Sequence, residues 1–293
     1  MRVGLRLFIV SLLLLVTLAM RVNSLISSEN NTITLEDAVK QKLISADIKG
    51  NGGYSGNCLK LAIKNLGNKS ISISIPAGTM FKPSDDGAQN ILVPKDQIFV
   101  LAGSENKNSL VRGFCCEATD HAPSKDMSFA ISKNTNPKMV QLINFVKTKS
   151  YADNILQDAI WCVSNNHEIT DIYAPNMEVI KPLRDELCKI TGQKDEWYST
   201  PKEHKVDEDG NISHETIQVS GQIKFKALAN GKVHNEIYDS ENKVLVKNPN
   251  SFEVIPGNIE YGFDIKVKGW KKGTYYVKVF ENEKVIHSQE FKI

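Results

Sequence analysis

Past its first twenty residues the sequence has no long hydrophobic run, and its charges of opposite sign nearly cancel. With 36 basic and 34 acidic residues the formal net charge is +2, and the basic residues are scattered along the chain. Nucleic-acid binding needs a concentrated basic face, so we expect no nucleic-acid partner. Because a spanning helix needs about 20 apolar residues, we also expect no membrane contact beyond the leader.

Recognisable catalytic and metal-binding patterns are missing as well. The six histidines have no spacing typical of metal ligands, so we predict no metal ion and no other cofactor. His121 in "HAPSKD" is predicted to be a solvated loop residue, and "GYSGN" lacks the context of a nucleophile elbow. No acid, base and nucleophile converge in the pattern, so no catalytic residue is predicted. An uncharacterised secreted enzyme is kept as an alternative hypothesis.

The first residues predict export. "MRVGLR" carries two arginines, "LFIVSLLLLVTLAM" is purely apolar, and "RVNSLISS" supplies small residues for cleavage around Ser24. This order is typical of a secretory signal peptide, which we place at residues 1–24. We therefore expect a protein that is secreted, displayed at the cell surface or held in the periplasm.

Five cysteines follow the leader, and an odd number cannot all pair within one chain. Export permits disulfides, for which the candidates are Cys58, Cys115, Cys116, Cys162 and Cys188. Successive side chains of a strand point to opposite faces, so Cys115 and Cys116 in "LVRGFCCE" cannot share an environment. Cys116 has the parity of Phe114 and Leu110 and is predicted to be buried. Cys115 and Cys58 are predicted to face outward, where they either bridge to each other or meet a covering helix.

The hydrophobic pattern predicts a mainly β fold of the α+β type. Short alternating strands such as "CLKLAIKN" and "SISISIPAG", separated by polar turns, indicate a β-sandwich in residues 25–192. Helical spacing after Asn136 predicts a helical subdomain within it, in "NPKMVQLINFVKTKS", "YADNILQDAIWCVSNN" and "EVIKPLRDELCKITG". Residues 193–213 are charged and turn-rich and are predicted to be a linker. The strands of residues 214–293 predict a smaller immunoglobulin-like β-sandwich, with a hairpin turn at "ENEK".

One helix carries an unusual polar residue. In "LQDAIW", Gln157 and Trp161 lie one turn apart on the flank of an apolar stripe. A glutamine held beside a tryptophan, at the edge of a helix that must pack on something, is not expected to be fully solvated. The simplest interpretation is a boundary glutamine packed against an aromatic neighbour.

The order "GFCCE", helices and "QDAIW" resembles the thioester domains of bacterial surface adhesins. In that family a strand cysteine preceded by an aromatic residue is cross-linked to the glutamine of a Thr-Gln-x-Ala-Ile-Trp-like helix. The domain carries a helical part on a β-sandwich-like part. The resemblance covers roughly residues 109–163, and the sequence departs from the pattern where Leu156 replaces threonine and the cysteine is doubled.

The resemblance implies a thioester between Gln157 and Cys115, with Cys116 as the second candidate. It also implies that Phe114 and Trp161 shield this bond from water. A thioester carbonyl is activated toward nucleophiles such as a lysine amine, so the implied partner is a protein or another ligand at a cell surface.

The last strands carry a second resemblance. "KGTYYVKVFENEKVIHSQEFKI" is similar to the closing strands of Gly-x-Tyr-type sandwich modules at the ends of exported Bacteroidetes proteins, some of which serve in sorting. The sequence as a whole therefore predicts a non-catalytic binding or adhesion protein. The alternative is a structural or secretion-linked envelope component whose last module serves sorting or docking.

Overall fold

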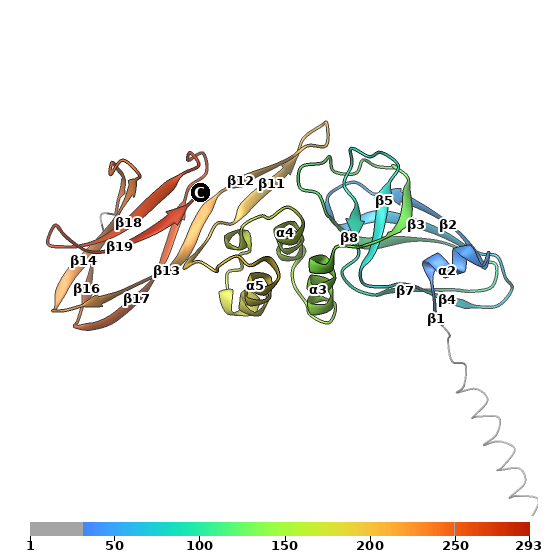
Figure 1. Cartoon of the computed structure of the whole chain (residues 1–293), viewed down its shortest axis with the longest axis horizontal. Coiled ribbons are helices and arrows are strands. Elements are labelled where there is room, and N and C mark those ends of the chain that lie inside the picture. Colours follow the sequence, from blue (N-terminus) through green and yellow to red (C-terminus); the bar gives the residue numbers. More distant parts are fainter. Residues whose placement is uncertain (1–31, 249) are drawn as a thin grey trace, which may run out of the picture. The chain divides into compact units, whose positions relative to one another are not determined.

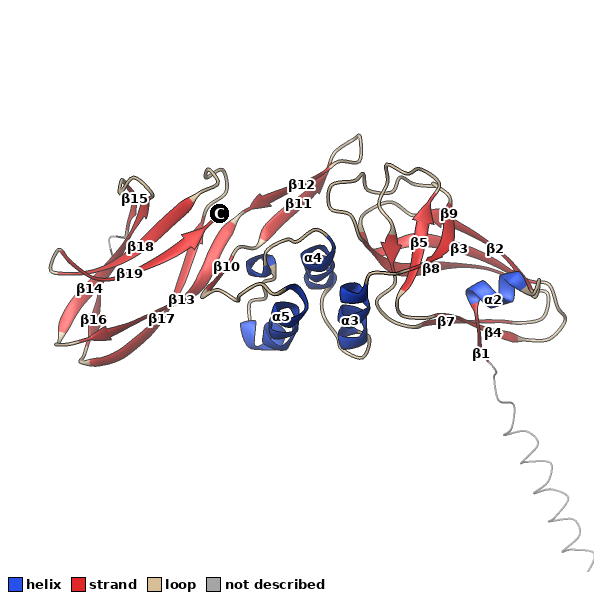
Figure 2. Ribbon diagram, viewed as in Figure 1, coloured by secondary structure: helices blue, strands red, loops and turns tan. Residues whose placement is uncertain are grey.

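The structure is a computed structural model that describes residues 32–248 and 250–293 (Figure 1). Strands dominate and three longer helices accompany them, which confirms the predicted mainly β fold with a helical part (Figure 2). The predicted signal peptide, residues 1–24, lies outside the described residues. No helix of the described part is long and apolar enough to cross a membrane.

The chain divides into two compact units. Among the described residues, the smaller consists of 32–45, Lys64–Ser74 and Ile98–Lys107, and the larger of Ala46–Ile63, Ile75–Gln97 and the part from Asn108 onward. A three-stranded sheet of order β1-β4-β7 belongs mostly to the smaller unit, and β1 runs parallel to β4. Its elements are β1 (Thr32–Thr34), α2 (Leu35–Lys40), β4 (Ile71–Ile75) and β7 (Gln97–Leu101). The Thr34 side chain caps α2 by accepting the backbone N–H of Asp37.

A six-stranded sheet of order β2-β3-β8-β6-β5-β9 positions the candidate site. Its strands are β2 (Ile44–Gly50), β3 (Ser55–Asn65), β8 (Asn106–Cys115), β6 (Ile91–Leu92), β5 (Thr79–Pro83) and β9 (Phe129–Lys133). Along β3, Leu59, Leu61 and Ile63 are buried. Lys60 and Lys64, which alternate with them, are exposed. This is the alternation that the sequence predicts for a strand with one buried face.

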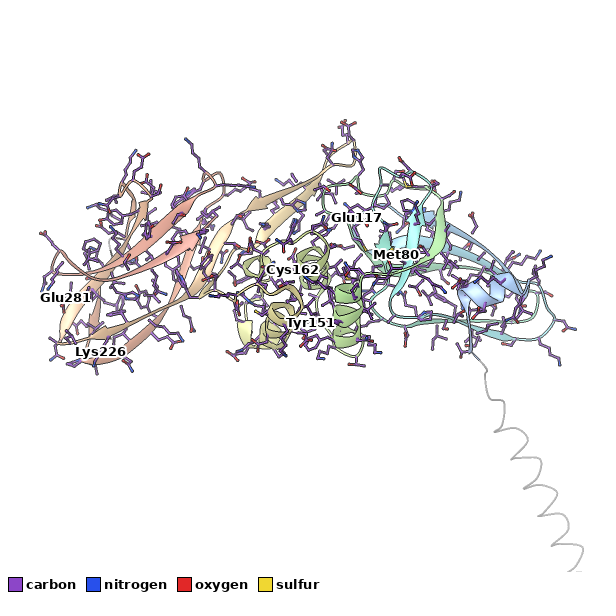
Figure 3. All side chains as sticks on the ribbon, in the orientation of Figure 1. Met80, Glu117, Tyr151, Cys162, Lys226 and Glu281 are labelled. Carbon is purple, nitrogen blue, oxygen red and sulfur yellow. The ribbon has the colours of Figure 1, made fainter. Side chains whose placement is uncertain are left out.

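Three helices follow at the predicted places: α3 (Pro137–Val146), α4 (Asp153–Ser164) and α5 (Met177–Thr191). Asn136 caps α3 and a proline occupies its first turn. Gly192 ends α5 in the left-handed conformation, with φ of 82°. The helices contribute to one hydrophobic cluster, which includes Phe114 of β8 and Cys162 of α4. Figure 3 labels Cys162 among the helices.

The C-terminal module is a β-sandwich. One sheet has the order β10-β13-β17, and the other has the order β15-β14-β18-β19 with β16 paired to β14. The strands are β10 (Tyr198–Ser199), β13 (Gln218–Ala227), β14 (Gly231–Asp239), β15 (Val244–Lys247), β16 (Phe252–Val254), β17 (Gly257–Lys266), β18 (Thr274–Glu281) and β19 (Lys284–Lys292). Residues from both sheets, such as Val219 and Val277, share one core. Asn282 and Glu283 both have positive φ, so the predicted β18–β19 hairpin turn has the type I′ form.

Residues 193–213, predicted to be a linker, are folded. β10 pairs with β13 of the C-terminal sandwich, so this module begins before residue 214. β11 (Lys202–Val206) and β12 (Ile212–Thr216) form a separate antiparallel hairpin. Some of the charges that suggested a linker lie in the loop before β10, and Lys205, Asp207, Glu208 and Asp209 are exposed on the hairpin and its turn.

Gly113 of β8 occupies a place where no side chain fits. A Cβ built on it would lie 2.3 Å from Cγ2 of buried Ile91 and 3.4 Å from Sγ of Cys58. We expect Gly113→Ala to lower the free energy of unfolding in urea by about 1–3 kcal/mol, because overpacking a core costs this much. Gly273→Ala is the matched control, since a Cβ there meets nothing within 4 Å. Equal stability of the two variants would contradict the packing described.

Candidate functional site

The candidate site forms where the end of β8 meets the first turns of α4. Cys115 is the last residue of β8 and lies opposite Ile91 of β6. Asp153, the first residue of α4, forms an ion pair with Arg112 of β8. The Asp153 carboxylate also lies so close to β3 that a Cβ on Gly56 would be 2.7 Å from it. The start of α4 is thus packed on both β3 and β8.

One turn further along α4, the side chain of Gln157 meets the backbone of Cys115. Its Nε2 donates a hydrogen bond of 2.8 Å to the Cys115 carbonyl oxygen, and its Oε1 accepts one of 3.2 Å from the Cys115 N–H. That N–H is shared with the carbonyl oxygen of Tyr54, at 2.9 Å. Cys115 and Gln157 are both 0 % exposed. The structure therefore brings together the first-choice cysteine and the glutamine of the predicted site.

All three cysteines of this sheet are buried. The face predicted to point outward at Cys58 and Cys115 is covered by α4, through Asp153 and Gln157, which is the covering helix that the sequence left open as an alternative to a bridge. Burial raises the pKa of Cys58 to about 12 and lifts the pKa of Cys115 and Cys116 well above the ordinary thiol range. The three side chains are therefore thiols at neutral pH.

The five cysteines, all within the described residues, are free thiols in the structure. The predicted disulfides thus have no counterpart in it. Cys162 on α4 and Cys188 on α5 pack against the same helical core. Burial raises the pKa of Cys162 to about 12, which marks it as a packed, unreactive thiol.

The side chains of Cys116 and Phe114 pack in a different place from that of Cys115. Both are buried, as their shared parity predicts, and both belong to the hydrophobic cluster of the helices. Sγ of Cys116 lies 4.0 Å from the carbonyl oxygen of Phe114, and the Arg112 guanidinium stacks 5.0 Å from the Phe114 ring centroid. The geometry therefore favours Cys115 over Cys116 as the neighbour of Gln157.

Trp161, one turn after Gln157, is fully buried among other rings. Its ring stacks on that of Tyr54, with centroids 5.6 Å apart. Three histidine rings pack around it, with centroid distances of 5.8 Å to His167, 5.0 Å to His204 and 4.9 Å to His214. The indole N–H has no hydrogen-bond partner among the described residues. Trp161 and Tyr54 together form an aromatic layer next to the Cys115–Gln157 pair.

Two of these histidines belong to a buried hydrogen-bonded chain. Nε2 of His204 lies 2.9 Å from the Asp158 carboxylate, and Nδ1 of His204 lies 2.8 Å from Nδ1 of His214. Nε2 of His214 lies 3.3 Å from the carbonyl oxygen of Ala118. A carbonyl only accepts, so His214 donates from Nε2 and its Nδ1 accepts from Nδ1–H of His204. The remaining nitrogen of His204 then shares one proton with Asp158.

The surroundings set the charges of the groups in this hydrogen-bonded series. Burial lowers the pKa of His214, which keeps this ring neutral and fit to accept from His204. Burial also raises the pKa of Asp158, and the hydrogen bond from His204 opposes that rise. Burial lowers the pKa of His167 to about 4. No group of three or more histidine, cysteine or acidic side chains in the described parts of the chain is arranged to hold a metal ion.

Sequence reasoning missed Asp158, His204 and His214. The histidines were judged by their spacing from one another, whereas their partner on α4 is 46 residues away along the chain. One local signal was present. "KEHKV" and "ISHET" flank the turn "DEDGN", and pairing them as a hairpin places His204 opposite His214.

No protein-family model and no curated protein matches this chain. Among solved structures it is similar to a β-glucosidase from Kluyveromyces marxianus, at 9 % identity over 80 % of this chain and 44 % of that one, with a TM-score of 0.20. A putative β-galactosidase from Bacteroides fragilis matches at 9 % identity over 84 % of this chain and 33 % of that one, with a TM-score of 0.21. A Bacteroides uniformis β-glucuronidase 2 matches at 11 % identity, 82 % and 26 % coverage, and a TM-score of 0.22. The chain spans less than half of each of these proteins. Likeness at this level supports no argument about function.

Proposed function

We propose that the chain is an exported binding or adhesion protein of the cell surface or periplasm that captures its ligand through a thioester between Cys115 and Gln157. The ligand is a protein or another surface molecule that presents a primary amine. One observation carries this proposal: a fully buried glutamine amide is hydrogen-bonded to both backbone groups of a cysteine. The signal-peptide pattern of residues 1–24 supports the location.

The reaction joins two residues that contact each other through the Gln157 amide and the Cys115 backbone. The Cys115 sulfur attacks Cδ of Gln157, the C–N bond of the amide breaks, and the nitrogen leaves as ammonia with the thiol proton. The product is a thioester that links β8 to α4. A primary amine of the ligand then attacks the same carbon, an amide bond forms, and Cys115 leaves as a thiol. No oxidant or cofactor enters either step.

The backbone of Cys115 assists the first step. Its N–H donates to Oε1 of Gln157, the oxygen on which negative charge develops in the tetrahedral intermediate. The bond from Nε2 to the Cys115 carbonyl fixes the rotation of the amide. Since burial keeps Cys115 in the thiol form, the attacking thiolate is rare and the bond forms slowly, once per molecule after folding.

The test is the intact mass of the purified mature chain, measured without reductant. We expect the chain to weigh less than its sequence by one ammonia, and methylamine to add its own mass to the product. Gln157→Ala and Cys115→Ala are expected to have their full sequence masses. Cys116→Ala is the matched control and should keep the deficit, because Cys116 faces the helical core. A full mass for the unmodified chain, or a deficit that depends on Cys116, contradicts the proposal.

A further inference from the structure

The β11–β12 hairpin stands by itself. Its two strands pair with each other and with no other strand of the described residues. A lone two-stranded hairpin is at best marginally stable in water. Its position therefore depends on the few side chains and backbone groups that reach across to the rest of the larger unit.

The central attachment is made by the two histidines. They occupy directly paired positions of the hairpin. His204 reaches Asp158 on α4 and His214 reaches the Ala118 carbonyl oxygen, which lies beyond the end of β8. The side chains of His204 and Asp158 are only 6 % and 10 % exposed, so this attachment is largely shielded from water.

Two further contacts flank the histidines. At the base of the hairpin, Nζ of Lys202 lies 2.5 Å from the carboxylate of Asp171. At the tip, the carbonyl oxygen of Gly210 accepts the backbone N–H of Ala122 at 2.8 Å. Glu203 and Glu215 also attach the hairpin, to Lys268 and to the backbone N–H of Gly269. Among these attachments, the histidine pair is the one that adjoins Trp161.

The aromatic layer of Trp161 and Tyr54 connects the hairpin to the Cys115–Gln157 pair through a series of contacts. Trp161 touches both histidine rings and is one turn from Gln157, while Tyr54 stacks on Trp161 and accepts the Cys115 N–H. Trp161 and Gln157 are fully buried, so no nucleophile reaches the pair in this conformation. The unpartnered N–H of Trp161 also costs free energy that contact with water would recover. Trp161 therefore stays shielded from water only while the hairpin remains attached next to it.

We propose that the β11–β12 hairpin is a lid over the Cys115–Gln157 site, with His204 and His214 as the positioning residues that hold it closed. The inference rests on the proposed function. The lid keeps water from the thioester, and its opening admits the amine of the ligand.

Acid is expected to open this lid. The titratable and charged groups around the two histidines come from each neighbouring element: Asp158, His167, Asp171, Lys202 and Tyr54. A protonated Nδ1 on His214 would face the N–H of His204 and lose that hydrogen bond. Since the closed form lowers the pKa of His214, its stability falls as the pH drops below about 6.5, the ordinary histidine value.

The test compares the rates at which methylamine enters the mature full-length chain and its variants. His204→Ala is expected to raise the rate at neutral pH by roughly tenfold or more, because loss of one charge-assisted hydrogen bond shifts an opening equilibrium by about that factor. Lys205→Ala is the matched control, since this neighbouring hairpin residue is exposed. Only unprotonated methylamine is a nucleophile, so the rate is expressed per concentration of that form. His214→Gln keeps a donor for the Ala118 carbonyl but cannot titrate, so it should flatten the rise of this rate in acid.

Hydrogen exchange of residues 202–216 provides a readout that does not need the thioester. We expect His204→Ala to lower the protection of the hairpin amides together with the faster methylamine reaction. Looser amides without a faster reaction, or a slower reaction, would overturn the lid. If the unmodified chain lacks the mass deficit, the proposed function fails by itself. The lid is then judged by alkylation of Cys115 in the native chain, which must be faster in His204→Ala.

Discussion

In a Cys115→Ala background, which cannot form the thioester, Gln157→Glu is expected to be nearly as stable as the Cys115→Ala chain in acid and weaker by about 3 kcal/mol or more at neutral pH. The glutamate has the shape of glutamine, but it donates to the Cys115 carbonyl only when protonated. Once ionised, it holds a buried charge against a carbonyl oxygen in a site that water does not reach. The variant is also expected to show its full sequence mass.

The sign of the pH dependence follows from the burial. The folded state raises the pKa of this glutamate above its unfolded value of about 4.3. Its contribution to stability is therefore fully present below that pH and is lost as the pH rises to the folded pKa. Urea unfolding from pH 4 to pH 8 measures the difference in free energy of unfolding from the Cys115→Ala chain, so groups common to both cancel. Gln157→Met in the same background is the control, and its loss in free energy of unfolding should not change with pH. A loss that does not change with pH for Gln157→Glu would mean that water reaches residue 157.

Local features of the fold were predictable because their causes are local. Alternation along β3 identified its buried face, and Pro137 and Gly192 marked a helix start and a helix end through their own backbone preferences. The turn at Asn282 and Glu283 was expected for the same reason. These signals act over a few residues, so a single sequence carries them completely.

The environment of the cysteines was not predictable in this way. Strand parity correctly separated Cys115 from Cys116, but it does not tell which face a later element will cover. Here α4 covers the face for which the sequence left a bridge or a covering helix open, and Cys58 is buried with Cys115. The contact between Gln157 and Cys115 was suggested only by a family resemblance, because it joins residues 42 positions apart.

The β11–β12 hairpin shows why charge composition gave the wrong domain boundary at residues 193–213. Residues 193–213 are rich in charge and turn formers, and this composition is shared by linkers and by exposed hairpins. What distinguishes the two is the side of the hairpin that faces the protein, where His204 and His214 alternate with exposed Lys205 and Ser213. A strand pattern with histidine as its inward residue has no strong hydrophobic signal.

Arg184 is expected to show the largest effect on stability. Its side chain is 3 % exposed and forms an ion pair with Asp195. It also donates to the Ser199 hydroxyl at 2.5 Å and to the carbonyl oxygens of Ile172 and Tyr198 at 3.2 and 3.3 Å. Asp195 is 34 % exposed and water can solvate it, but the Ser199 hydroxyl and the two carbonyl oxygens lose a buried donor. At roughly 1–3 kcal/mol for each unsatisfied group, the total is about 3–5 kcal/mol. We therefore expect Arg184→Met to lower the free energy of unfolding by that amount.

Arg184→Lys should not restore stability, since one ammonium group cannot reach four acceptors that are arranged for a guanidinium. Lys181→Ala is the matched control on the same helix. Lys181 is exposed and pairs with Asp185 one turn on, so its loss should cost no more than about 0.5 kcal/mol. Because Arg184 lies on α5 and Ser199 lies in β10 of the C-terminal sandwich, losing this contact also uncouples the helices from that sandwich. Urea unfolding of Arg184→Met is therefore expected to separate into two transitions, and a single transition at the original midpoint would contradict this joint.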